Sequence, residues 1–308
     1  CMTHQRESFV LLDEHDAPIR PAVLWLDTRA ADQIARFGSD HVHALSGKPP
    51  STTPSLYKLI WLAEHEPQAM RAARRVVEVH AYLTHELTGQ WVTSWATADP
   101  MAVLGMSSFE YSEELLALAG LGLDQMAELR PPGSVMATVT DDVADSLGLP
   151  RDLPVVAGAG DGQSAGLGAN VTTASRAYLS LGTSMTMGIH SEQYLYSRAF
   201  RTLSSPIAGS YTLEALLSSG GLCIALFRDR LSGMDPADGP IEPRLEELAA
   251  GVPAGARGVQ FLPYLTSAET PTGTRTRAGP SSVSPTPTAP RSCTGRCWRA
   301  WPWRNGCR

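Results

Sequence analysis

The stretch that decides the fold is LPVVAGAGDGQSAGLGAN, residues 153–170. Its first five residues, 153–157, form a short apolar run typical of a buried strand. A glycine-rich turn follows at residues 158–162 and carries a single carboxylate, that of Asp161. Glycines without a Cβ allow the backbone to approach another group closely. A strand that passes through such a turn into a helix is typical of an active site.

A second strand and turn lie at residues 177–184, AYLSLGTS. A turn made of Gly182, Thr183 and Ser184 can cradle phosphate through its backbone N–H groups, although such a turn alone is more often only a turn.

We place a domain boundary near residues 169–174. Both sides predict an α/β architecture, with strands at residues 9–12, 22–26, 76–79, 153–157, 177–181 and 259–262, and helices at 30–37, 56–64, 68–75, 80–87, 99–106, 112–119, 141–147, 213–230 and 244–250.

Composition excludes several classes of protein. The 308 residues, 43% hydrophobic and 18% charged, suit a soluble enzyme with two domains of ordinary size. No apolar run approaches the roughly 20 residues that span a bilayer. The chain begins with Cys1 rather than Met and has no signal-peptide pattern, so we expect a cytoplasmic protein whose natural start lies upstream. Its eight histidines show no metal-ligand spacing, which predicts no protein-bound metal.

Seven ordered blocks resemble the FGGY carbohydrate kinase family over about residues 5–271. They are THQRESFVLLDEHDAPIRPAVLWLDTRA, SLYKLIWLAEHEPQ, AYLTHELTG, residues 95–99, the stretch at 153–170, AYLSLGTS and FLPYLTSAETP. The resemblance implies an actin-like (ribonuclease H-like) ATPase fold, with two related α/β domains around a cleft. It places a sugar-binding domain at residues 1–169, without the family's first phosphate loop, and the start of an incomplete ATP-binding domain at residues 170–271.

The resemblance also implies a chemistry, the ATP-dependent phosphorylation of a sugar hydroxyl. Asp161 is then the general base, and the cofactors are ATP and the Mg²⁺ that accompanies it. The implied sugar contacts are Gln5, Arg6, Glu7, Gly162 and Gln163. The implied contacts to the ATP phosphates are Gly182, Thr183 and Ser184.

The identity of the substrate rests on cues that disagree. Gln5-Arg6-Glu7 is more like the glycerol kinases, whereas the rest of the first domain is more like the xylulokinases. A pentulose such as D-xylulose is therefore the first choice, and glycerol or another polyol is the second. A function of another class, a non-catalytic sugar-binding remnant, stays open, as does a homodimer of the intact enzyme. We expect no nucleic-acid or membrane partner.

Residues 272–308 differ from the rest of the chain. All 31 acidic residues precede Thr270, whereas seven of the 25 basic residues follow it. At face value this is a disordered basic tail. Reading the reconstructed codons in a neighbouring frame instead gives a string that ends RAVLEGVALEERL, with helical apolar spacing and a resemblance to a family helix. We therefore interpret residues 272–308 as an out-of-frame tail after a frameshift near Pro271.

This interpretation is tested by resequencing the DNA across the codons for residues 269–277. We expect an inserted or deleted base there. An unbroken frame whose codons cannot encode the reconstructed string would contradict the frameshift. A second expectation is that the 308-residue chain lacks ATP affinity, and tight ATP binding measured by calorimetry would contradict it.

Overall fold

The computed structural model describes residues 1–182, 184–217, 219–259 and 261. The chain forms two compact units, the first made of Cys1–Leu179 and Met187–Ala215 and the second of Ser180–Thr186 and the residues from Leu216 onward. The predicted boundary near residues 169–174 thus falls inside the first unit. This unit takes in residues 187–215 because they bond to its earlier part, for example through the Thr202 N–H, which donates to the Gly47 carbonyl at 2.8 Å.

The main core of the first unit lies among short helices beside a strand pair. Strand β1 (Phe9–Leu12) pairs antiparallel with β2 (Arg75–Glu78), and Phe9 faces Glu78. Leu56, Leu59 and Ile60 recur at helical spacing, so one face of α3 is apolar and buried. The helices of this part are α1 (Ala31–Phe37), α2 (Asp40–Ser46), α3 (Ser55–His65), α4 (Pro67–Ala72) and α7 (Glu113–Leu118).

Further strand pairs lead toward the glycine-rich turn. Strand β3 (Val92–Ser94) is parallel to β6 (Glu128–Arg130), and β7 (Val135–Thr138) is antiparallel to β8 (Pro154–Val156). The chain leaves β8 through the glycine turn and enters α9 (Asp161–Gly168). The predicted order of strand, turn and helix is therefore confirmed. Around these pairs lie α5 (Val79–Thr88), α6 (Trp95–Ala98), α8 (Asp141–Leu147), η1 (Asp99–Met101), η2 (Leu123–Gln125), β4 (Leu104–Gly105) and β5 (Glu110–Tyr111).

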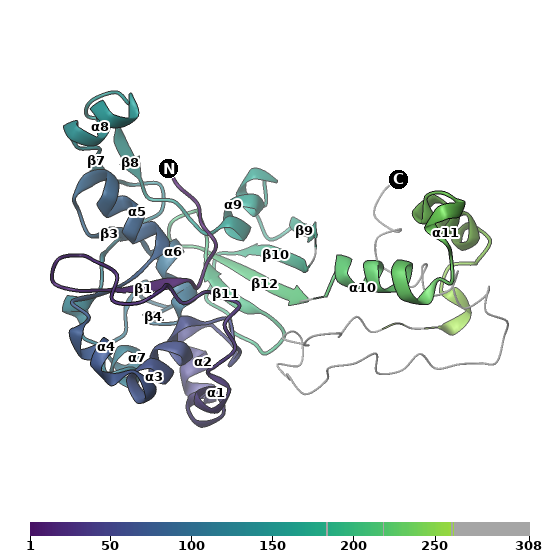
Figure 1. Ribbon diagram of the computed structural model, residues 1–308, viewed down its shortest axis with the longest axis horizontal. Helices are drawn as coiled ribbons and strands as arrows, with labels where there is room; N and C mark the ends of the chain where they lie inside the picture. Colours follow the sequence, from purple (N-terminus) through teal and green to yellow (C-terminus); the bar gives the residue numbers. More distant parts are fainter. Residues whose placement is uncertain (183, 218, 260, 262–308) are drawn as a thin grey trace. The chain divides into compact units, whose positions relative to one another are not determined.

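A four-stranded sheet follows, in the order β11-β12-β10-β9. Its strands are β9 (Ala177–Leu181), β10 (Met185–Ser191), β11 (Arg201–Ser204) and β12 (Tyr211–Leu217), which run side by side in Figure 1. Strands β11 and β12 are antiparallel, and Arg201 lies directly opposite Glu214. This register decides the geometry of the site described below.

The second unit contains α10 (Gly221–Leu226), the π-helical turn η3 (Phe227–Leu231), η4 (Pro236–Asp238), α11 (Ile241–Ala250) and η5 (Ala256–Gly258). Met185 and Cys223 are buried in its small apolar cluster, which Phe261 also contacts. The predicted strand at residues 259–262 and the tail at 272–308 lie partly or wholly outside the described residues. No helix among the described residues is long and apolar enough to cross a membrane.

Three sequence predictions of secondary structure are wrong. The helix predicted at residues 99–106 is a single 3₁₀ turn followed by β4, because Ala102 adopts a φ of 62° and Leu104 pairs with Tyr111. The helix predicted at residues 213–230 begins only at Gly221, since residues 211–217 form strand β12, whose first four residues pair with β11. The strand predicted at residues 22–26 amounts to one bridge, between Phe9 and Val23.

A buried ion pair ties β11 to the helical part of the first unit. Lys48, whose side chain is 2% exposed, places its Nζ 3.0 Å from Oδ2 of Asp99. The same Oδ2 accepts the Ser204 N–H at 2.7 Å. Burial lowers the pKa of Lys48 and raises that of Asp99, so each group needs the charge of the other. Removing one partner leaves the other charge uncompensated in the core.

We expect Lys48→Met to lower the free energy of unfolding by about 3–5 kcal/mol, the usual cost of an orphaned buried charge. Urea unfolding followed by tryptophan fluorescence measures this cost. The double variant Lys48→Met, Asp99→Asn should regain much of the lost stability because no charge is left unpaired. The matched control is Arg151→Met at an exposed pair with Asp145, 2.8 Å apart, which should leave the midpoint unchanged. Equal midpoints for Lys48→Met and the wild type would contradict this role.

Candidate functional site

Asp161 lies where β8 gives way to α9, and the backbone fixes its position. Its N–H donates to the His4 carbonyl at 3.2 Å, and its Oδ1 accepts the Gly162 N–H at 2.9 Å. The side chain is nevertheless 57% exposed. A carboxylate that is held in place and still open to solvent can reach a substrate hydroxyl, as a general base must.

The N-terminal loop runs beside this carboxylate. His4 forms a parallel bridge with Gly160, and Nε of Arg6 lies 3.4 Å from Oδ1 of Asp161. The structure therefore brings together two residues that the sequence analysis assigned to one site from opposite ends of the domain. Gln5, the first residue of the predicted sugar loop, is exposed. Its contact with a sugar stays a prediction.

Glu7 is buried and has an unusual backbone conformation, with a φ of 66°. This left-handed region disfavours residues with a Cβ, so the surroundings must hold it. The Ser55 hydroxyl donates to the Glu7 carbonyl at 3.0 Å, and Nη1 of Arg201 donates to Oε1 of Glu7 at 2.7 Å. Strain at a residue held on both its backbone and its side chain is typical of a functional site.

The glycines of the turn make room for the protein's own side chains. A Cβ on Gly160 would lie 2.4 Å from Cδ of Arg6. A Cβ on Gly162 would lie 3.0 Å from Oε2 of Glu214 and 3.1 Å from Nη2 of Arg6. We expected these glycines to let a substrate approach the backbone, and the close approach seen here is that of Arg6 and Glu214. A contact between Gly162 and a sugar stays a prediction.

Gln163 is 1% exposed. Its Nε2 donates to the carbonyl of Ala96 at 2.9 Å and to that of Ser204 at 3.0 Å, so both amide hydrogens are committed. Its Oε1 is buried and has no hydrogen-bond partner among the residues that the structure describes. A predicted contact of Gln163 with the sugar would therefore have to use this oxygen as an acceptor.

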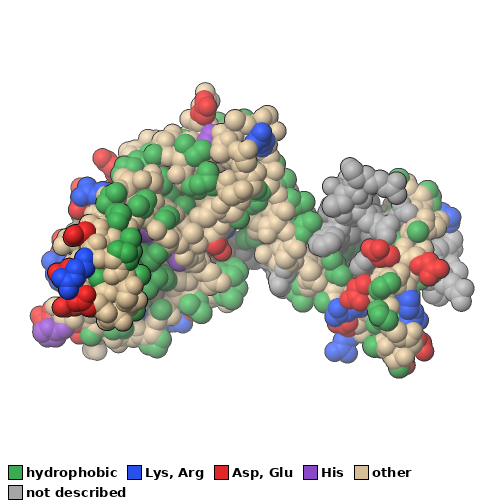
Figure 2. All heavy atoms as spheres, turned by 90° about the horizontal axis from the view of Figure 1, so that it is seen from above, with side chains coloured by type: hydrophobic (Ala, Val, Ile, Leu, Met, Phe, Trp, Pro, Cys, Tyr) green, Lys and Arg blue, Asp and Glu red, His purple; other side chains and the backbone are tan. Residues whose placement is uncertain are grey.

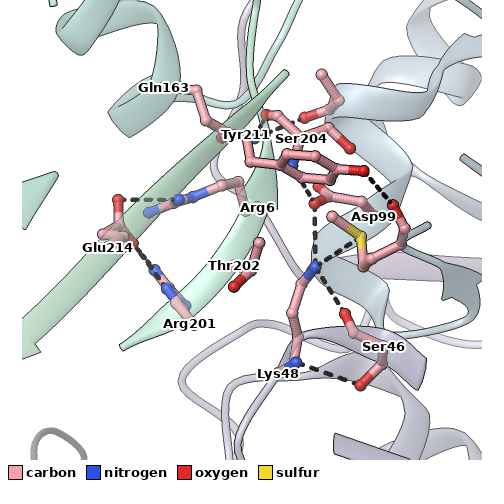
Figure 3. A network of polar contacts seen from close by, with 12 residues as sticks. Arg6, Ser46, Lys48, Asp99, Gln163, Arg201, Thr202, Ser204, Tyr211 and Glu214 are labelled. Atoms are coloured by element: carbon pink, nitrogen blue, oxygen red, sulfur yellow. Dashed lines mark hydrogen bonds and ion pairs between the residues drawn. The ribbon is translucent and has the colours of Figure 1, made fainter. Parts of the chain in front are cut away.

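Two functional candidates were missed by the sequence analysis, Arg201 and Glu214. Figure 3 shows Arg6 and Arg201 converging on the Glu214 carboxylate. Nε of Arg201 donates to Oε1 at 2.7 Å, and Nη1 of Arg6 donates to Oε2 at 3.2 Å. The sequence does contain one signal: Glu214 is a lone acid in the apolar run YTLEALL, which was interpreted as part of an amphipathic helix.

Burial and charge compete at Glu214, whose side chain is 0% exposed. Burial alone would raise its pKa, but the guanidinium groups of Arg201 and Arg6 outweigh burial and lower the pKa to about 2. Burial, together with the Glu214 carboxylate, raises the pKa of Tyr178, whose hydroxyl donates to Oε2 of Glu214 at 2.9 Å. Glu214 is thus a permanent anion with donors on both oxygens.

The predicted phosphate turn belongs to the second unit, and Thr183 lies outside the described residues. The Gly182 N–H donates to the Ser184 carbonyl at 3.0 Å, which closes the turn. Among the described residues, an added Cβ on Gly182 would come within 4 Å of the Ser184 carbonyl oxygen alone, at 3.7 Å. Phosphate binding by this turn stays a prediction. No cluster of three or more metal-ligating side chains occurs among the described residues.

The charged surface seen in Figure 2 carries acidic and basic side chains interspersed over the described residues. Many of them form ion pairs, such as Arg151 with Asp145 at 2.8 Å and Arg228 with Glu242 at 2.8 Å.

Residues 1–168 match the model described as the FGGY family of carbohydrate kinases, N-terminal domain, and the chain belongs to this family. The xylulose kinase of Streptomyces rubiginosus is 37% identical over 188 residues, which cover 59% of this chain and 38% of that protein. The gluconokinase of Bacillus licheniformis is 24% identical over 279 residues, which cover 86% of this chain and 53% of that protein.

A solved structure confirms the predicted fold class. The xylulose kinase from Rhodospirillum rubrum matches with a TM-score of 0.84 and 27% identity, covering 98% of this chain and 60% of that one. The actin-like α/β fold is therefore established. The chain spans between 38% and 60% of the length of these three relatives.

The lowered pKa of Glu214 predicts a specific loss of stability in acid. A carboxylate whose folded pKa lies below its unfolded value stabilises the fold above the unfolded pKa and loses that effect as the pH falls through the folded pKa. The window runs from 4.5 down to about 2. A shift of this size corresponds to about 3 kcal/mol. We expect the unfolding free energy of the wild type to fall more steeply over this window than that of Glu214→Gln. Parallel curves in denaturant titrations would contradict this assignment.

Proposed function

We propose that this chain is part of an enzyme that transfers the γ-phosphoryl group of ATP to a hydroxyl of an uncharged sugar. The first choice of substrate is a pentulose such as D-xylulose. The observation that carries the proposal is the exposed Asp161 carboxylate, fixed at the strand-to-helix turn beside Arg6. Membership of a carbohydrate kinase family and similarity to two xylulose kinases support it.

The chemistry assigns one task to each part of the site. Asp161 accepts the proton of the attacking hydroxyl, whose oxygen bonds to the γ-phosphorus while the bond to ADP breaks. Arg6 and Glu7 offer N–H donors and carboxylate acceptors that suit vicinal hydroxyls. The turn at Gly182 and Ser184 would hold the ATP phosphates, and the Mg²⁺ bound with the nucleotide would neutralise charge on them.

Charge favours a neutral substrate over an aldonate. Arg6 pairs with Glu214 and Asp161, and Arg201 pairs with Glu7 and Glu214. Two guanidinium groups thus face three carboxylates, so these groups together carry a net negative charge. An anionic substrate such as gluconate would be repelled, even though a gluconokinase is among the relatives. The second candidate, glycerol or another polyol, is uncharged as well and fits Gln5-Arg6-Glu7.

A sugar-binding remnant without catalysis is the alternative of another class. It shares the sugar site with the kinase and differs only in the phosphoryl transfer. Calorimetric titration of the 308-residue chain with D-xylulose, D-ribulose, glycerol and D-gluconate measures sugar binding. A coupled assay for ADP measures turnover. Binding of a neutral sugar without ADP release, even in a version extended to the length of the relatives, would favour the remnant.

We expect Asp161→Asn, in a version extended to the length of the relatives, to lower kcat by roughly 10²- to 10⁴-fold, the usual contribution of general acid–base catalysis. The amide keeps the size of the side chain but accepts no proton, so the sugar Kd should barely change. The coupled ADP assay and calorimetry supply the two readouts. Turnover within about threefold of the wild type would remove Asp161 from the mechanism.

A further inference from the structure

The Glu214 carboxylate joins segments that lie far apart in the sequence. It receives Arg201 from β11, Tyr178 from β9 and Arg6 from the N-terminal loop. It also lies beyond residue 168, where the match to the family's N-terminal domain ends. Glu214 is therefore a fully buried anion in contact with Arg6, a predicted sugar-binding residue, which suggests that it has a role in the site.

We propose that Glu214 is a positioning residue, which holds the Arg6 guanidinium in the orientation that faces Asp161 and the sugar. This inference rests on the proposed function, because it assigns Glu214 a task in the same sugar site. Glu214 itself has no exposed surface, so it cannot contact a sugar directly, and its direct partner in the predicted sugar loop is Arg6.

The argument begins with what would hold Arg6 if Glu214 were absent. The remaining pair, with Asp161, is 3.4 Å long, and Asp161 is 57% exposed. A pair whose carboxylate is this exposed contributes little, and the long arginine side chain has many rotamers. Asp161 alone would therefore leave Arg6 among several rotamers. The buried carboxylate of Glu214 selects one of them.

The space around Glu214 is shaped for this contact. Gly162 has no Cβ, which would otherwise lie 3.0 Å from Oε2. The Tyr178 ring lies so close to Gly166 and Gly188 that a Cβ on either would clash with it, at 2.9 Å and 2.3 Å. The ring is thereby fixed, and its hydroxyl points at Oε2 of Glu214. Glycines on α9 and β10 thus fix the position of the Tyr178 hydroxyl, which orients the Glu214 carboxylate.

The same carboxylate also reaches Glu7, the neighbour of Arg6. Arg201 donates to Oε1 of Glu214 and, through Nη1, to Oε1 of Glu7 at 2.7 Å. The β11–β12 hairpin is itself anchored, since Ser204 bonds to both Asp99 and Gln163. The hairpin therefore acts as a rigid support for both charged residues of the sugar loop.

A purely structural ion pair is the competing interpretation, and coupling to Arg6 separates the two. If Glu214 acts through Arg6, removing Arg6 first makes the later loss of Glu214 harmless for sugar binding. If Glu214 only stabilises the fold, its loss has the same effect in both backgrounds. A double-mutant cycle measures this difference.

The experiment determines the Kd for D-xylulose by calorimetry on the 308-residue chain, for the wild type, Glu214→Gln, Arg6→Ala and the double variant. We expect Glu214→Gln to raise Kd about 10- to 100-fold, as expected for a lost bond to a charged group. In the Arg6→Ala background the same change should alter Kd by less than about threefold. The matched control, Glu192→Gln at an exposed position close to β10, should leave Kd unchanged.

Three outcomes would overturn a claim: two of them concern the positioning role alone, and the third concerns the proposed function as well. A Kd for Glu214→Gln within about threefold of the wild type, or an equal change in both backgrounds, overturns the positioning role alone. A wild-type chain that binds no neutral sugar of the panel overturns the proposed function, and the positioning role with it. If thermal unfolding shows that Glu214→Gln does not fold, Tyr178→Phe takes its place. It removes one donor to the same oxygen and should raise Kd about three- to tenfold, again only when Arg6 is present.

Discussion

The burial of one carboxylate, that of Glu214, is the constraint on which the site depends. An ion removed from water costs several kcal/mol unless hydrogen-bonded opposite charges compensate for it. Here the compensation comes from Arg201, Arg6 and Tyr178, which belong to three separate segments. The sheet must therefore form in register, and the N-terminal loop must lie against α9, before the charge is satisfied. The same contacts therefore stabilise the fold and set the geometry of the site.

A second buried pair holds the other end of the same hairpin strand. Lys48 and Asp99 lie away from solvent, and Oδ2 of Asp99 accepts the N–H of Ser204 at the end of β11. Arg201 begins β11, so the strand is fixed by charged groups at both ends. Side chains mounted on a strand held in this way keep their orientation without a ligand. A preorganised site avoids the entropy cost of ordering them when a sugar binds.

The sequence was informative where signals are local. The apolar run and glycine turn around Asp161 predicted the strand, turn and helix that the structure contains, and Nε of Arg6, which the resemblance assigned to the same site, lies 3.4 Å from Oδ1 of Asp161. Glu214 could not be found in this way. Its apolar neighbours permit a helix as well as a strand, and only pairing with β11, a non-local event, decides between them. The pairing of Arg201 with Glu214 is the result of that register.

The charge balance of the site also bears on how it would recognise a sugar. Carboxylates neutralise the charges of Arg6 and Arg201. A guanidinium has five N–H hydrogens, however, and a hydrogen bond to one carboxylate does not use all of them. The hydrogens that remain on Arg6 can donate to hydroxyls, while its net attraction for an anion is cancelled. Such a site would distinguish neutral substrates from one another by the direction of their hydroxyls. Of the three carboxylates that pair with these arginines, Asp161 is the exposed one, whereas Glu7 and Glu214 are buried.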